Sequence, residues 1–232
     1  MKNIHLITVM LGIFFLISCS KKDNTANPSD IWDIETNGIP KFVNHDFIEL
    51  EKVKRVSKYR SSEGHDYSDA FEHCRSMKHY FEPSCFVDWA AVQIFSPVDG
   101  QIKKMEQEWA GIKIEIESSK YPAFRFIIFH VNINSGIITG DSVRSGQLLG
   151  LHVGSQTMSD IAVMVNDPTR QGRLVSFFET LADSVFDHYV ARSVTAREML
   201  IIPKELRDAN PLFCDGENFV GNNTIDNWVV LN

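Results

Sequence analysis

Residues 91–166 most constrain the fold, because they divide into short apolar segments separated by turn-forming residues. Residues 112–117 alternate apolar and charged side chains, the pattern of a strand with one buried face. Asp99-Gly100 and Gly140-Asp141 mark turns. The expected strands cover residues 92–95, 101–105, 112–117, 124–131, 148–151 and 161–165. The short strands and frequent turns predict a small antiparallel β sandwich or barrel, a mainly β fold.

The segments on either side of these strands have helical features. Beyond Pro168, apolar side chains recur at helical spacing from Leu174 to Tyr189, which predicts a helix over residues 172–192. A shorter helix is expected over residues 70–81. The last 30 residues, rich in Asn, Asp and Gly, are expected to be mostly loop.

The domain organisation follows from these patterns. Residues 31–166 are expected to form the β domain with an N-terminal extension. Residues 167–232 are expected to be an α-helical C-terminal extension packed on it. A chain of this size suits one large domain, or one domain with an appendage.

The N-terminus has the layout of an export signal. Lys2 precedes an apolar run over residues 4–17, which is near the length of a signal-peptide core and short of the roughly 20 residues that a spanning helix needs. The run ends in Leu-Ile-Ser-Cys at residues 16–19, which resembles the lipobox of bacterial lipoproteins. That resemblance implies a signal peptide over residues 1–18 and an acylated Cys19 as the membrane anchor. The alternative is an ordinary secretory signal with a chance cysteine.

The composition limits the location, the partners and the cysteine chemistry. Residues 19–30 are polar and should form a flexible tether. The resemblance to the lipobox implies that the protein is in the bacterial cell envelope, with the outer membrane expected. The net charge of −7, without a Lys/Arg cluster, argues against a nucleic-acid partner. In an oxidising location Cys74 and Cys85, close in sequence, are expected to form a disulfide, which leaves Cys214 as a buried thiol. Without a Cys-x-x-Cys spacing, a structural zinc is disfavoured.

Two motifs in the predicted β region are typical of one family. Residues 96–102 read Ser-Pro-Val-Asp-Gly-Gln-Ile, and residues 140–150 match the pattern G-D-x-V-x-x-G-Q-x-[IL]-G. Together they resemble the lysostaphin/LytM-type zinc endopeptidases, whose domain has the duplicated hybrid motif fold and a similar Asp-Gly hairpin. Biotinyl and lipoyl carrier domains share the second motif, but they need a lysine in a tight hairpin that this sequence lacks there.

The resemblance implies a zinc site that this chain keeps only in part. His65 and Asp69 have the His-x-x-x-Asp spacing of two ligands, and His130 precedes the Gly-Asp motif as the family's strand histidine does. In the strand after that motif the family has His-x-His, where this chain has Asp160 and Ala162. Alanine cannot bind metal, so the third ligand is missing. Zinc with three protein ligands and one open position can activate water.

Several functions therefore stay open at the level of sequence. The leading hypothesis is a degenerate, non-catalytic module that binds a wall peptide, a glycan or another envelope protein, without a cofactor. The alternative is a zinc metalloendopeptidase that cleaves peptidoglycan cross-links, with His130 as its catalytic residue. A rearranged metal site would combine His65, Asp69 and His130 with Asp160 or His152. A purely structural lipoprotein in a larger envelope complex is the third possibility.

Overall fold

The computed structural model describes residues 30–221 and 223–232. The predicted signal peptide over residues 1–18, the predicted lipid on Cys19 and the tether up to residue 29 lie outside the described residues. Within the described part of the chain, no helix combines the length and the apolar character needed to cross a bilayer.

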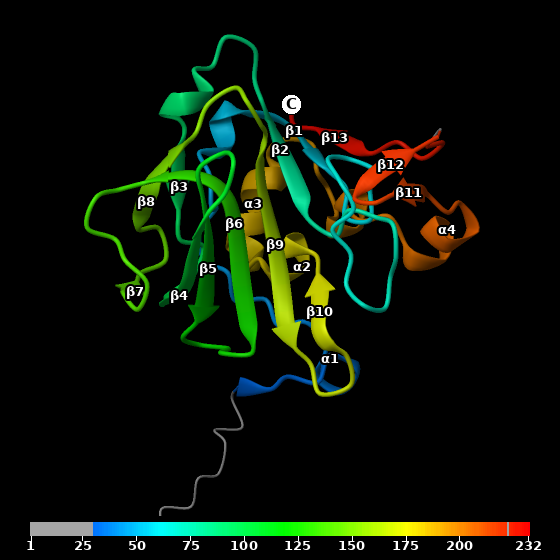
Figure 1. Cartoon of the computed structure of the whole chain (residues 1–232), viewed down its shortest axis with the longest axis horizontal. Coiled ribbons are helices and arrows are strands. Elements are labelled where there is room, and N and C mark those ends of the chain that lie inside the picture. The colour runs from blue at the N-terminus through cyan, green and yellow to red at the C-terminus, as the bar shows by residue number, and fades with distance from the viewer. Residues whose placement is uncertain (1–29, 222) are drawn as a thin grey trace, which may run out of the picture.

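Most strands join one antiparallel sheet (Figure 1). Its main path runs β13-β1-β2-β9-β6-β5-β4-β7, while β10 pairs with β9 and β8 pairs with both β3 and β6. The strands of this sheet are β1 (Val53–Ser57), β2 (His79–Pro83), β3 (Gln93–Phe95), β4 (Gly100–Gln107), β5 (Ile112–Ser118), β6 (Phe124–Ile133), β7 (Ser142–Val143), β8 (Leu148–His152), β9 (Ser159–Asn166), β10 (Gln171–Val175) and β13 (Trp228–Val230). The predicted mainly β, antiparallel fold is confirmed.

Short helices and one small hairpin complete the fold. Figure 1 shows α2 and α3 behind the large sheet, with α4 and the hairpin of β11 and β12 to one side. The hairpin strands are β11 (Phe213–Asp215) and β12 (Asn218–Val220). The α-helices are α1 (Ile34–Asn37), α2 (Phe177–Thr180), α3 (Asp183–Val190) and α4 (Lys204–Ala209), and the 3-10 helices are η2 (Leu50–Lys52), η3 (Trp89–Ala91) and η4 (Arg197–Leu200).

The prediction of one helix over residues 172–192 is wrong. Leu174 and Val175 belong to β10 and pair with β9. Ser176 then caps α2 in a capping box with Glu179, and Leu181 bridges to Val43 before α3 begins. Apolar residues in consecutive short elements happen to be spaced like the apolar face of one long helix. Strands β10 and β13, both beyond residue 166, also join the main sheet.

Two further expectations differ from the structure. Residues 70–78 form turns and bends instead of a helix, and Phe81 lies inside β2. The last 30 residues contain α4 and strands β11, β12 and β13 in addition to loop. The β strand is favoured at residues 79–83 because the chain there pairs with β1 on one side and with β9 on the other. These tertiary contacts outweigh the local sequence preference.

The sheet has a main core on one face and a smaller apolar cluster on the other. Strand β6 is buried on both faces: Phe126 and Ile128 enter the main core, while Ile127 and Phe129 join the second cluster. Strand β9 divides in the same way, and its Ala162 belongs to the second cluster. Alternation along a strand places residues two apart on one face, so Asp160 lies on the face of Ala162. That face carries the candidate site.

His79 ties β2 to the main core and gives stability a pH dependence. Its ring contacts the Ser57 carbonyl at 2.8 Å and the Ser176 hydroxyl at 2.9 Å, and burial lowers its pKa from 6.5 to about 4. Between these values the unfolded chain binds more protons than the folded one. The contribution of His79 to the free energy of unfolding is therefore complete above pH 6.5 and declines as the pH falls toward 4, by roughly 3 kcal/mol.

Urea unfolding measured from pH 7.5 to pH 4 tests this expectation. The wild type should lose stability over this range, and His79→Gln should lose less, because the buried imidazole is gone. Identical slopes in the two proteins would contradict the assignment of the pH dependence to His79.

Candidate functional site

A groove of about 850 Å³ opens on the face of the sheet that carries the second apolar cluster. Side chains from β2 and β6 meet there with the loops on either side. Among the residues that line the groove are His65, Lys78, Trp109, His130 and Glu217.

A β-bulge directs His130 into the groove. In the pairing of β5 with β6, Ile112 faces Val131 and Ile114 faces Ile128, so two residues of β6 oppose the single residue Lys113. His130 adopts a φ of 62° at this bulge. Bulges re-aim side chains in this way and are frequent next to functional sites. The His130 Nδ1 atom lies 2.9 Å from the Ala110 carbonyl and its Nε2 atom lies 3.2 Å from Asp160 Oδ1.

His65 enters the groove from the loop before β2. Its Nδ1 atom lies 3.0 Å from the Asp66 carbonyl, and its Nε2 atom faces the ammonium of Lys78 at 3.2 Å. Gly64 makes this approach feasible, because it has a φ of +67° and a Cβ there would stand 2.0 Å from the hydroxyl of Tyr80.

A buried ion pair lies between these two histidines. The Lys78 ammonium is 2.6 Å from Asp160 Oδ2, and the two side chains are 2% and 0% exposed. Burial alone would lower the pKa of Lys78, but the Asp160 carboxylate outweighs it and the pKa is raised above its usual value. Lys78 is therefore charged at any physiological pH, and this charge needs its partner because an isolated buried ion is very costly.

Aromatic rings surround the same ammonium. Its nitrogen lies 4.1, 4.8 and 5.1 Å from the ring centroids of Phe129, Tyr67 and Tyr80. Such rings attract a cation through the electron density on their faces. Burial raises the pKa of Tyr80 to about 12, so its hydroxyl stays protonated beside the pair.

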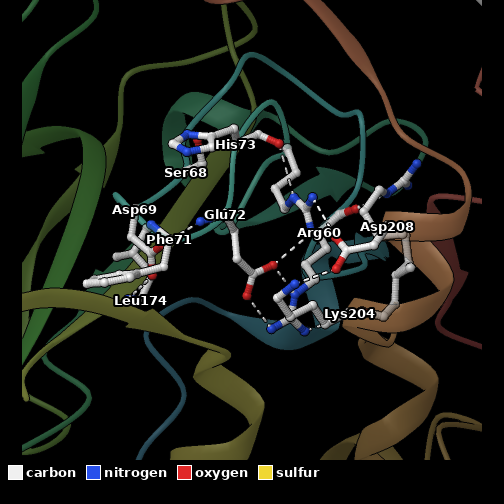
Figure 2. A network of polar contacts seen from close by, with 12 residues as sticks. Arg60, Ser68, Asp69, Phe71, Glu72, His73, Leu174, Lys204 and Asp208 are labelled. Carbon is white, nitrogen blue, oxygen red and sulfur yellow. Dashed lines mark hydrogen bonds and ion pairs between the residues drawn. The ribbon is translucent and has the colours of Figure 1, made fainter. Parts of the chain in front are cut away.

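Asp69 performs a structural task instead of joining His65. Its Oδ1 atom accepts from the backbone N–H groups of Phe71 and Glu72, and its Oδ2 atom accepts from that of Leu174 (Figure 2). These bonds fasten the loop after residue 68 to β10. The neighbouring Glu72 carboxylate binds Arg60 at 2.6 and 2.7 Å, which holds the same loop.

The residues expected to hold zinc do not fit that ion. Asp69 is engaged by backbone donors, and Ala162 offers no ligand atom. His152 is buried against Trp89 and its Nδ1 atom accepts from the Gly154 N–H. In the described ranges, 30–221 and 223–232, no three His, Cys, Asp or Glu side chains are placed to hold one metal ion. The structure brings His65 to the ammonium and His130 to the carboxylate of the buried Lys78–Asp160 pair.

The disulfide also differs from the expected one. Cys74 pairs with Cys214, 140 residues away, and Cys85 is a free, exposed thiol. The fold places the β11–β12 hairpin against the loop that contains Cys74. The disulfide partner of Cys74 is therefore the cysteine nearest in space and not the one nearest in sequence. The Glu217 carbonyl on this hairpin accepts from the Asp66 N–H at 2.7 Å, which makes the hairpin one wall of the groove.

Sequence reasoning missed Lys78, Trp109 and Glu217. Trp109 stands at the turn between β4 and β5, is 76% exposed, and lies 5.9 Å from the His130 ring between centroids.

Comparisons with known proteins reveal similarity only in structure. No protein-family model matches the sequence, and no curated protein matches it. A structure described as a lytM glycyl-glycine endopeptidase from Ruminococcus gnavus is 16% identical, with a TM-score of 0.34, over 44% of this chain and 43% of that one. Lysostaphin is 15% identical, with a TM-score of 0.37, over 55% of this chain and 50% of that protein.

A third similar structure is the SpoIIQ-SpoIIIAH pore forming complex. It is 13% identical, with a TM-score of 0.43, over 61% of this chain and 91% of that one. The chain thus spans half or less of the first two structures named. At these identities the likeness concerns the fold alone.

Proposed function

We propose that this chain is a lipid-anchored cell-envelope protein whose LytM-like domain binds a ligand in the groove and does not cleave it. The observation that carries this proposal is the buried Lys78–Asp160 pair. This charged pair lies between the two histidines, with its ammonium 3.2 Å from His65 Nε2 and its carboxylate 3.2 Å from His130 Nε2. Because Lys78 is held charged, it cannot act as a base that activates water.

The rest of the groove suits binding. Trp109 offers an exposed aromatic face at its rim, a residue type that dominates recognition energies. Glu217 stands on the opposite hairpin wall with its carboxylate in solvent. The ligands proposed for this groove are a wall peptide, a glycan or an envelope protein, and the membrane contact is the lipid on Cys19.

Co-sedimentation of the full chain with purified peptidoglycan sacculi tests the proposal. We expect binding without release of soluble fragments, and Trp109→Ala should weaken it about tenfold or more because the exposed anchor is lost. Ile138→Ala is the matched control, since Ile138 is 63% exposed and apolar but does not line the groove.

The remaining outcomes separate the alternatives. Zinc-dependent release of cross-link peptides would contradict the proposal and would support a zinc metalloendopeptidase. Absence of binding to sacculi would exclude wall peptides and glycans and leave an envelope protein as the ligand, to be sought with Trp109→Ala as the negative control.

A further inference from the structure

A small polar cavity lies apart from the groove, between β10, the loop that carries Asp69 and Glu72, and the segment that leads into α4. Its volume is about 240 Å³, below the roughly 300–1,000 Å³ of pockets that enclose drug-sized ligands. None of the residues that line it also lines the groove. Figure 2 shows Glu72 in this region, with Arg60 and Lys204 on one side of it and Asp69 on the other. A space of this size suits a small ligand.

Four basic side chains line the cavity, those of Arg60, Arg170, Arg173 and Lys204. Arg60 and Lys204 are held by carboxylates of the chain. Arg170 differs from them. Within residues 30–221 and 223–232, its guanidinium has no hydrogen-bond or ion-pair partner, and it lies over the Phe71 ring at 5.5 Å from the centroid. One of the four cations is therefore without an anion.

Arg173 also has donors without partners. Its Nη1 atom lies 2.7 Å from Glu35 and 3.3 Å from Asp167, whereas its Nε and Nη2 atoms have no partner in the described part of the chain. The Arg173 side chain is only 18% exposed, so water satisfies these donors poorly. A guanidinium carries five N–H donors and accepts nothing. Two arginines close together in sequence thus bring an excess of donors to the cavity.

The carboxylates that line the cavity are mostly engaged by other donors. Asp69 accepts from three backbone N–H groups, and both oxygens of Glu72 are bonded to Arg60. Glu179 accepts the N–H of the α2 capping box through Oε2, and burial raises the pKa of this carboxyl. Among the described residues, Glu179 Oε1 is the carboxylate oxygen of the lining that has no donor. The free side-chain donors of the cavity therefore exceed its free carboxylate acceptors.

We propose that this cavity binds a small oxyanion, a phosphate or carboxylate group held by Arg170 and Arg173. A planar guanidinium offers parallel N–H donors that match two oxygens of such a group at once. The anion supplies the acceptors that these two side chains lack. Arg60 and Lys204 add positive charge to the walls, and their own ion pairs keep them in place.

Titration of the full chain with inorganic phosphate at constant ionic strength tests the inference. We expect saturable binding by calorimetry and a rise in melting temperature, because a ligand of the folded state stabilises that state. Arg170→Ala should weaken binding at least about tenfold, since the guanidinium without another partner is lost. Arg125→Ala is the matched control and should bind like the wild type. Arg125 pairs with Glu115 and Glu117 and does not line this cavity.

A second variant should act in the opposite direction. Glu179→Gln keeps the capping box with Ser176, because glutamine also serves at that position, and it removes a negative charge beside the anion. Phosphate should therefore bind this variant several-fold more tightly than the wild type. A parallel titration with acetate shows which of the two groups the cavity prefers.

Two results would overturn the inference. One is the absence of saturable binding of both phosphate and acetate at millimolar concentrations. The other is equal affinity of the wild type and Arg170→Ala, which would place the anion elsewhere on the surface. Sacculus binding depends on the groove, whose lining residues are all different, so the proposed function and this inference can fail independently.

Discussion

Asp160→Asn is expected to lower the free energy of unfolding by roughly 3–5 kcal/mol, the usual cost of leaving one partner of a buried ion pair alone. The substitution keeps the size of the side chain and removes its charge. Lys78, with 2% of its side chain exposed, then loses the carboxylate that balances its buried charge. The aromatic rings around the ammonium attract it too weakly to replace a carboxylate at 2.6 Å. Urea unfolding of the wild type and the variant measures the difference.

Two further variants separate burial from charge. Lys78→Met combined with Asp160→Leu removes both charges and fills the space with apolar atoms, so it should unfold close to the wild type. The exposed pair of Lys41 and Asp183 is the control, because its side chains are 49% and 75% exposed. Breaking it with Asp183→Asn should cost no more than about 1 kcal/mol. Equal costs for the buried and the exposed pair would mean that Lys78 and Asp160 are not buried together.

The β part of the fold was predictable because the pattern of apolar and polar residues in each strand reflects which of its faces are buried. Alternating side chains at residues 112–117 correspond to β5, and the continuously apolar segment 124–131 corresponds to β6, which is buried on both faces. Turn residues gave the ends of these strands. This information is local, so a single sequence is enough to find it.

The helical prediction failed where the information is not local. Leu174, Phe178 and Leu181 are all buried and spaced as on a helix, yet they lie in a strand, a short helix and a bridge to Val43. The capping box of Ser176 with Glu179 marked a helix start inside the expected helix. A helix start at Ser176 is inconsistent with a helix that begins at residue 172, so the sequence itself indicated a break.

The candidate site was predictable only in its histidines and in Asp160. The spacing of His65 and the strand position of His130 follow from family-like motifs, and both reach the groove. The predicted ligand Asp69 accepts hydrogen bonds from three backbone N–H groups, and one of them, that of Leu174, is 105 residues away in sequence. The burial of Lys78 could not be predicted from sequence, because it depends on pairing with Asp160, which is distant along the chain.

Loss of the Cys74–Cys214 disulfide is expected to lower the free energy of unfolding by roughly 2–5 kcal/mol, because the bond closes a long loop and restricts the unfolded chain. The two cysteines are 140 residues apart in sequence, which places the expected effect in the upper part of this range. Cys74→Ala with Cys214→Ala, compared with the wild type by urea unfolding, measures the loss. The substitution removes both sulfurs of the bond, so neither of these positions can pair with Cys85.

The same variant should also loosen the wall of the groove. Without the disulfide, the β11–β12 hairpin is held beside the groove by contacts such as the bond from the Asp66 N–H to the Glu217 carbonyl. Hydrogen exchange at the Asp66 amide should therefore accelerate more than exchange in the middle of β6, since local opening precedes global unfolding. Cys85→Ser is the matched control and should change stability by no more than about 0.5 kcal/mol, because Cys85 is exposed and unpaired. Uniform acceleration at all amides would mean that the disulfide stabilises the whole domain and does not specifically hold the groove wall.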